Sequence, residues 1–165
     1  MTTSGEVFLN PGDFCFADGE IRLRTLLGSC VSITLWHRRT HIGGMCHFMN
    51  PSRGQQSDVE ELDGRYADEA VEMFLRELNR HGTRPQEYEV QMFGGGNQFP
   101  DTPTPAALDV SRGNVAAGLR LLRQHGFTLT TVHLGGTGYR RVEFDLTTGA
   151  VRMTHVDHAD AGRTT

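Results

Sequence analysis

The chain has 165 residues, of which 37% are hydrophobic and 22% charged, and its formal net charge is −4. This length allows one domain with a substantial hydrophobic core, and the composition is typical of a globular protein. The negative charge, and basic runs no longer than Arg38-Arg39 or Arg140-Arg141, argue against a general nucleic-acid binder. We expect no membrane insertion, because no apolar run approaches bilayer length and the first residues do not resemble a signal peptide.

The three cysteines are Cys15, Cys30 and Cys46. A small, odd number of cysteines favours a reducing cytoplasm over a disulfide framework, so we expect a cytoplasmic protein. The chain contains no Cys-x-x-Cys or His-x-x-x-His spacing of the kind that builds zinc sites. Cys46 and His47 are adjacent in a predicted strand and therefore point to opposite faces. We expect neither a metal nor a cofactor.

Hydrophobic periodicity predicts several short strands, two helices and then more strands. The first predicted strands lie near residues 6–10, 13–17, 31–36 and 42–49, and residues 21–27 lead into the strand at 31–36. A helix over 66–81, a strand over 87–93 and a helix from Ser111 or Asn114 to His125 follow. The last predicted strands lie near 128–134, 142–146 and 150–154. The absence of a regular βαβ alternation favours an α+β fold, a single layered domain whose mixed or mainly antiparallel sheet packs with two helices. We expect this domain to span residues 1–155 and a polar tail to span 156–165.

Two connections have distinctive compositions. The polar stretch Ser52–Gly64 reads as a mobile loop, either a lid that contacts substrate or a solvated connection. Gly94-Gly95-Gly96 follows a predicted strand, but it lacks the lysine and serine or threonine of a phosphate-binding loop. We therefore interpret these glycines as a close backbone approach near an active site.

Residues 26–49 form a predicted hairpin that contains the most distinctive chemistry. Val31, Ile33 and Leu35 alternate with polar or bulky residues, as in a strand, and Cys30 stands at its start. A turn centred on Arg38-Arg39 would place Cys30 directly opposite His47, on the same face of the hairpin. A different turn would change this register.

A cysteine beside a histidine is the core of many covalent hydrolases. The imidazole accepts the thiol proton, and the resulting thiolate is the nucleophile. Backbone N–H groups beside Cys30 could bind an oxyanion, because Gly28 and Ser29 are small. The alternative from residue types alone is a buried structural cysteine and a structural histidine.

The motifs together resemble the CheD family of chemoreceptor glutamine deamidases. The segments that carry the resemblance are Leu27-Gly28-Ser29-Cys30-Val31, Gly43 to Pro51, Arg65-Tyr66-Ala67-Asp68, Phe93 to Asn97, Arg112-Gly113-Asn114-Val115 and Gly135 to Val142. It extends from about Phe8 to Met153, nearly the whole chain, and implies a layered α/β domain. It also implies hydrolysis of protein glutamine side chains in chemotaxis signal adaptation, with methyl-accepting chemoreceptors as substrates and the phosphatase CheC as a possible partner.

The resemblance assigns roles to three residues. Cys30 matches the nucleophile and His47 the general base. The third catalytic residue of the family is a threonine a few positions before the cysteine, and Thr25 lies five positions before Cys30. If the family position is six before, Arg24 occupies it and this sequence departs from the pattern.

Two further function classes remain open. One is a non-catalytic CheD-like protein that binds receptors or CheC, which a changed neighbourhood at Arg24-Thr25 would favour. The other is a different cysteine hydrolase, such as a thioesterase or peptidase, that uses the same Cys30–His47 pair.

Overall fold

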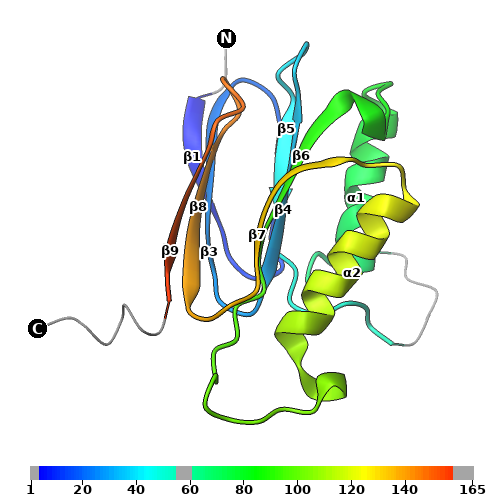
Figure 1. Cartoon of the computed structure of the whole chain (residues 1–165). Helices are drawn as coiled ribbons and strands as arrows, with labels where there is room; N and C mark the ends of the chain where they lie inside the picture. The colour runs from blue at the N-terminus through cyan, green and yellow to red at the C-terminus, as the bar shows by residue number, and fades with distance from the viewer. Residues whose placement is uncertain (1–3, 55–60, 158–165) are drawn as a thin grey trace, which may run out of the picture.

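The computed structural model describes residues 4–54 and 61–157. Two β-sheets lie face to face, and two helices cover the outer face of one of them (Figure 1). The α+β class and the pair of main helices are confirmed. The strands, however, form two sheets instead of the single sheet that the sequence suggested.

The outer sheet has four strands in the order β1-β3-β8-β9. These are β1 (Ser4–Leu9), β3 (Glu20–Leu27), β8 (Tyr139–Asp145) and β9 (Val151–Val156). β1 runs parallel to β3, and the other pairs are antiparallel. Strand β3 alternates strictly, with Ile21, Leu23, Thr25 and Leu27 buried. Its buried side faces the second sheet, because these aliphatic residues pack in one core with residues of β4 and β5.

The central sheet has five strands in the order β2-β5-β4-β6-β7. These are β2 (Phe14–Ala17), β5 (Gly43–Cys46), β4 (Val31–His37), β6 (Tyr88–Gly94) and β7 (Leu129–Leu134). Every pair is antiparallel except β6 with β7. All seven residues of β4 are buried, because this strand lies between the outer sheet on one side and the helices on the other.

The helices are α1 (Ala67–Arg80) and α2 (Val110–Gln124). The predicted helix over 66–81 is confirmed as α1, and its Ala70, Phe74 and Leu78 are buried against the central sheet. Helix α2 begins slightly earlier than predicted, because the Asp109 side chain accepts a hydrogen bond from the backbone N–H of Arg112 and caps it. Two short 3₁₀ turns, η1 (Pro85–Glu87) and η2 (Ala106–Leu108), precede β6 and α2.

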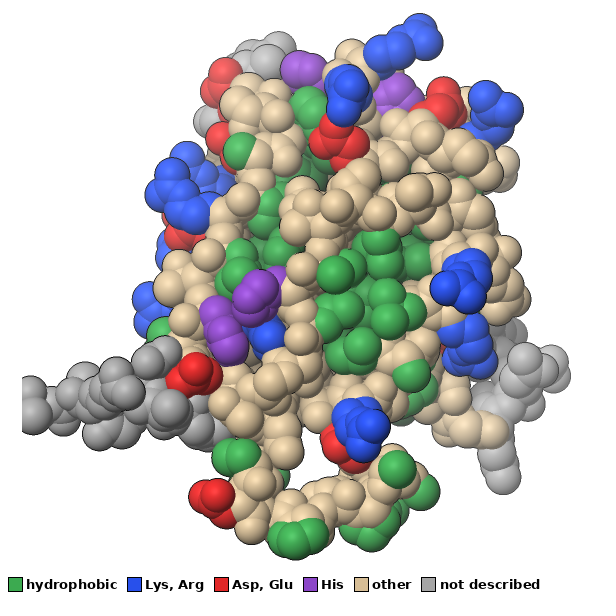
Figure 2. All heavy atoms as spheres, viewed as in Figure 1, with side chains coloured by type: hydrophobic (Ala, Val, Ile, Leu, Met, Phe, Trp, Pro, Cys, Tyr) green, Lys and Arg blue, Asp and Glu red, His purple; other side chains and the backbone are tan. Residues whose placement is uncertain are grey.

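Two hydrophobic cores result from this layering. Val31, Ile33 and Leu35 point toward the helices, whereas Trp36 and Met45 point between the sheets. The layers leave some apolar surface uncovered, and Figure 2 shows hydrophobic side chains over the junction of β7 and α2. Leu119 on α2 and Val132 on β7 are 40% and 49% exposed. Within the described residues, no helix is both long and apolar enough to cross a bilayer.

The predicted register of the β4–β5 hairpin is wrong by two residues. Trp36 pairs with Gly43, and Thr34 pairs with Met45. An isolated bridge between Val31 and Phe48 continues the same register. The reason is His37, which precedes the predicted turn at Arg38-Arg39 and is only 5% exposed. Its Nδ1 accepts weak hydrogen bonds from the backbone N–H groups of Arg39 and Thr40, which draws His37 into the strand.

Parts of two predicted segments lie outside the described residues. These are residues 55–60 of the polar connection Ser52–Gly64 and residues 158–165 of the predicted tail. Strand β9 ends at Val156.

Candidate active site

Thr25 and His47 meet in the space between the two sheets. The Thr25 Oγ1 atom, on β3 of the outer sheet, lies 2.7 Å from Nδ1 of His47, which follows β5 of the central sheet. Both residues are buried, with 2% and 1% exposure. The neighbouring Arg24 instead points to the outer face, where its guanidinium approaches Glu6 and Glu143. Thr25, not Arg24, therefore lies against the predicted base.

The hydrogen bonds of Thr25 determine the tautomer of His47. The Thr25 hydroxyl donates to the backbone carbonyl of Leu9 at 2.8 Å, and it has only one proton to give. Its oxygen must then accept from His47, so the His47 ring carries its proton on Nδ1. The other ring nitrogen, Nε2, is buried and has no hydrogen-bond partner among the described residues. This arrangement leaves a basic lone pair available on Nε2.

Cys30 and His47 lie on the same face of the central sheet, although they are not directly opposite. In the observed register Ser32 is the residue across from His47, and Cys30 lies two positions from Ser32 on the same face. Cys30 packs against the core between the sheets, toward which His47 also points. Such diagonal neighbours have Cα atoms about 7–8 Å apart, with their Cβ atoms somewhat closer. The shared face is confirmed, because a register error of two residues preserves it.

The electrostatics of the site favour neutral groups. Burial lowers the pKa of His47 to about 4, although the Leu9 carbonyl and Asp13 raise it in part. Burial also raises the pKa of Cys30, an effect opposed by a hydrogen bond with the Ser29 side chain. Both directions disfavour a thiolate–imidazolium pair in the free protein.

Gly94, the last residue of β6, and the two glycines after it pack against the backbone of the Cys30 segment. The N–H of Gly95 donates to the Cys30 carbonyl at 2.9 Å, and the N–H of Gly96 donates to the Gly28 carbonyl at 3.0 Å. A Cβ at Gly94 would lie only 2.2 Å from the Cys30 carbonyl oxygen. The prediction of a close backbone approach at these glycines is confirmed.

A buried arginine holds the glycine loops together. Arg140, only 1% exposed, donates from Nη1 to the Gly94 carbonyl at 3.2 Å and from Nη2 to the Gly135 carbonyl at 2.6 Å. Its Nε donates to Nδ1 of His133 at 2.9 Å. Sequence reasoning missed this role, because an Arg-Arg pair at the start of a strand looks like exposed charge.

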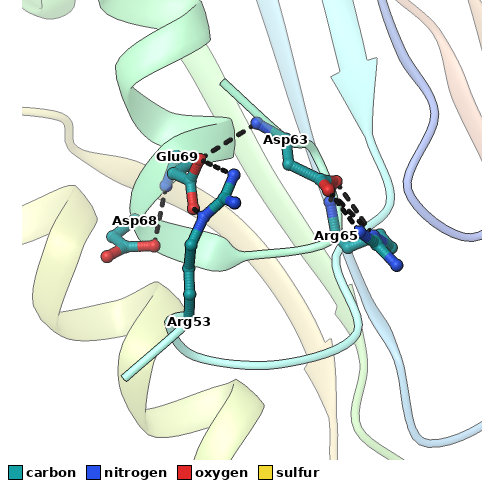
Figure 3. A network of polar contacts seen from close by, with 5 residues as sticks. All are labelled: Arg53, Asp63, Arg65, Asp68 and Glu69. Carbon is teal, nitrogen blue, oxygen red and sulfur yellow. Dashed lines mark hydrogen bonds and ion pairs between the residues drawn. The ribbon is translucent and has the colours of Figure 1, made fainter. Parts of the chain in front are cut away.

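The start of α1 anchors both sides of the polar connection that follows His47. The Glu69 carboxylate accepts two hydrogen bonds from the Arg53 guanidinium, each 2.7 Å long, and one from the Asp63 N–H at 3.1 Å (Figure 3). Asp63 in turn holds Arg65, and the two guanidinium groups lie over the ring of Tyr66. The two ends of this connection are thereby fixed to the same helix.

Within the ranges that the structure describes, no three His, Cys, Asp or Glu side chains gather in a way that could hold a metal ion. Cys46 packs in the helix-side core, while His47 points toward the outer sheet. The prediction that these two adjacent residues face opposite sides of their strand is confirmed.

Comparison with known proteins shows the family to which this chain is related. Residues 49–155 match the family described as CheD chemotactic sensory transduction. The chain is 47% identical, over 94% of its length and 91% of the relative's, to a probable chemoreceptor glutamine deamidase CheD 3 of Dechloromonas aromatica. It is 49% identical, over 91% of its length and 84% of the relative's, to a probable chemoreceptor glutamine deamidase CheD of Pseudomonas fluorescens.

The family match begins just after His47, whereas the similarity to these relatives covers nearly the whole chain. A match over more than half of the chain, together with identities near one half, establishes the relationship. The chain belongs to the CheD family.

Proposed function

We propose that this protein is a chemoreceptor glutamine deamidase. It hydrolyses glutamine side-chain amides of methyl-accepting chemoreceptors to glutamate and ammonia, as part of signal adaptation in chemotaxis. The names of the relatives support this activity. The observation that carries it is the Thr25–His47 hydrogen bond. It leaves Nε2 of His47, which has no hydrogen-bond partner among the described residues, on the face that His47 shares with Cys30.

The proposed first half-reaction forms a thioester. His47 Nε2 accepts the Cys30 thiol proton as the sulfur attacks the amide carbon, which forms the S–C bond. The C–N bond then breaks, and the imidazolium returns the proton to the departing nitrogen, which leaves as ammonia. Thr25 keeps Nδ1 of the imidazole in a hydrogen bond throughout, so that Nε2 remains the basic atom.

The second half-reaction restores the thiol. His47 Nε2 accepts a proton from water as the water oxygen attacks the thioester carbon. The S–C bond breaks, and the sulfur regains that proton. The glutamic acid that forms on the receptor then ionises to a carboxylate, and its proton passes through solvent to ammonia, which becomes ammonium. Because burial opposes charge on both Cys30 and His47, proton transfer accompanies substrate attack instead of preceding it.

The cellular setting follows from the same proposal. We place the protein in the cytoplasm, where thiols stay reduced and receptor signalling domains are exposed. We also propose CheC as a partner. The proposed functional domain spans residues 1–155, and residues 156–165 form a tail. Conversion of glutamine to glutamate adds a negative charge to a receptor, which alters the electrostatics between its helices.

The non-catalytic alternative loses its main support. It depends on a changed neighbourhood at Arg24-Thr25, and the contact of Thr25 with His47 speaks against such a change. A different cysteine hydrolase remains the second candidate, since the Cys30–His47–Thr25 arrangement alone does not select an amide of glutamine.

The test is mass spectrometry of a chemoreceptor cytoplasmic domain incubated with the wild-type protein, with Cys30→Ala or with Cys15→Ala. We expect a gain of about 1 Da at specific glutamines with the wild-type protein and with Cys15→Ala, but none with Cys30→Ala. Small thioesters and peptides are tested alongside. Hydrolysis of these with no receptor mass change would favour the second candidate, and no reaction in any sample would overturn the enzymatic proposal.

A further inference from the structure

The two segments that carry Cys30 and His47 separate at Cys30, the residue before their last backbone pair. Their last ladder pair is Val31 with Phe48, whose backbone groups exchange hydrogen bonds of 3.1 and 3.0 Å. One residue further on, the N–H groups of Met49 and Asn50 turn away and both donate to the Arg65 carbonyl. The ladder between these two segments therefore stops before Cys30, whose carbonyl instead accepts a hydrogen bond from the Gly95 N–H at 2.9 Å.

A side chain from α2 spans the point of separation. The Nδ2 group of Asn114 donates to the Ser29 carbonyl at 3.2 Å and to the Met49 carbonyl at 2.9 Å. Ser29 precedes Cys30, and Met49 lies two residues after His47. The Asn114 amide group has two N–H donors, and each serves one of the two segments.

From these contacts we propose that Asn114 is a positioning residue that sets the geometry between Cys30 and His47. It joins the Cys30 segment to the His47 segment beyond their last ladder pair, whereas the Gly95 bond to the Cys30 carbonyl ties Cys30 only to the end of β6. For its catalytic consequence, this inference rests on the proposed function. Its structural consequence, the restraint of the Cys30 segment, does not.

The hydrogen bonding of Asn114 argues against an ordinary helix role. Asn114 is completely buried, and its Oδ1 has no partner among the described residues. Capping of α2 is performed by Asp109, so Asn114 is not needed for that purpose. A buried polar group with an unpaired acceptor is costly. Its two donor contacts are both to the segments that carry the candidate site, which is what a bridge between them requires.

The test uses Asn114→Ala and Asn114→Asp, of which the second keeps the size of the side chain but replaces the NH₂ group, with its two N–H donors, by oxygen. Ser111→Ala is the matched control, since Ser111 is a buried polar residue of the same helix whose hydroxyl donates to Asp109 and not to the segments of the candidate site. Two quantities are measured for each protein: the kinetics of receptor deamidation, and the rates at which iodoacetamide modifies Cys30 and Cys46 under native conditions.

We expect both Asn114 variants to lose about 100-fold in kcat with KM changed less than about threefold, because small displacements of reacting groups cost this much. We also expect iodoacetamide to alkylate Cys30 faster than in the wild-type protein at pH 7.5, because a released segment exposes its thiol to solvent. Cys46, buried in the neighbouring core, should stay unreactive, and Ser111→Ala should match the wild type.

Three results would overturn the inference: an unchanged kcat, an unchanged Cys30 alkylation rate, or equal acceleration of Cys30 and Cys46, which would indicate general loosening. If one Asn114 variant does not fold, the other decides. If the wild-type protein itself deamidates nothing, the proposed function fails, while the alkylation comparison still tests the restraint of Cys30.

Discussion

The hydroxyl of Thr25 and the imidazole of His47 form a 2.7 Å hydrogen bond that links the outer sheet to the central sheet. The same hydroxyl donates to the Leu9 carbonyl, so the chain Leu9–Thr25–His47 has one consistent direction of protons. That direction leaves His47 Nε2 as the basic atom. The contact between the two sheets therefore also determines which ring nitrogen of the candidate base carries the proton.

Removal of the Thr25 hydroxyl should impair catalysis more than folding. Thr25→Val keeps the shape of the side chain but frees Nδ1 of His47, and we expect a loss of about 100-fold or more in kcat. Thr25→Ser, which keeps the hydroxyl, is the control and should retain most of the activity. Receptor deamidation followed by mass spectrometry measures both, and wild-type activity in Thr25→Val would refute a role for Thr25.

His47 should make stability depend on pH. Its folded-state pKa of about 4 lies below the ordinary value of 6.5, so the unfolded chain binds a proton more readily than the folded one. The stability that this group contributes is present above pH 6.5 and is lost as the pH falls toward 4, at about 1.4 kcal/mol per pH unit.

Urea unfolding at pH 6.5 and pH 5 tests this dependence. The free energy of unfolding of the wild-type protein should fall by about 2 kcal/mol more over this interval than that of His47→Gln. His81→Gln, which removes an exposed histidine, should behave like the wild type. Equal slopes for wild type and His47→Gln would show that His47 is not held neutral.

The location of Cys30 and His47 was predictable because strand alternation depends only on period two. Their exact pairing was not predictable, because it depends on which residues form the turn. His37 changes the position of the turn, since its Nδ1 accepts hydrogen bonds from the backbone N–H groups of Arg39 and Thr40. An alternating pattern shows which face a residue occupies. It does not show at which residue the strand ends and the turn begins.

Contacts between layers were beyond the reach of local patterns. The partner of Thr25 became visible only when two separate sheets were packed face to face, and the sequence had suggested a single sheet. Asn114 had one available signal, since it lies seven positions before buried Leu121 on the inward face of α2. A polar residue on such a face indicates a specific buried partner, although not which one.

Cys30 should behave as a protected thiol in the free protein. The direction of its pKa, raised by burial, predicts that iodoacetamide modifies it slowly at pH 7 and progressively faster above pH 8.5. Cys46, whose pKa burial raises to about 12, should react only after unfolding. Peptide mass spectrometry across a pH series measures each site, and a Cys30 rate that is already maximal below pH 7 would indicate a resting ion pair instead.

The approach of Gly94 to the Cys30 carbonyl yields a matched pair of substitutions. Gly94 and Gly135 have φ values of 117° and 78°, so alanine is strained at either position. A Cβ at Gly94 would lie 2.2 Å from the Cys30 carbonyl oxygen, whereas one at Gly135 would meet nothing within 4 Å. The difference between Gly94→Ala and Gly135→Ala therefore isolates the steric contact with the nucleophile segment.

We expect Gly94→Ala to lower the free energy of unfolding by at least about 2 kcal/mol more than Gly135→Ala, and to reduce deamidation because the Cys30 backbone must move. Urea unfolding and the receptor assay measure the two effects. Equal destabilisation would mean that strain at positive φ accounts for the whole cost. Greater destabilisation by Gly94→Ala with undiminished activity would mean that Cys30 tolerates displacement of its own carbonyl, and the close packing beneath it would then serve folding alone.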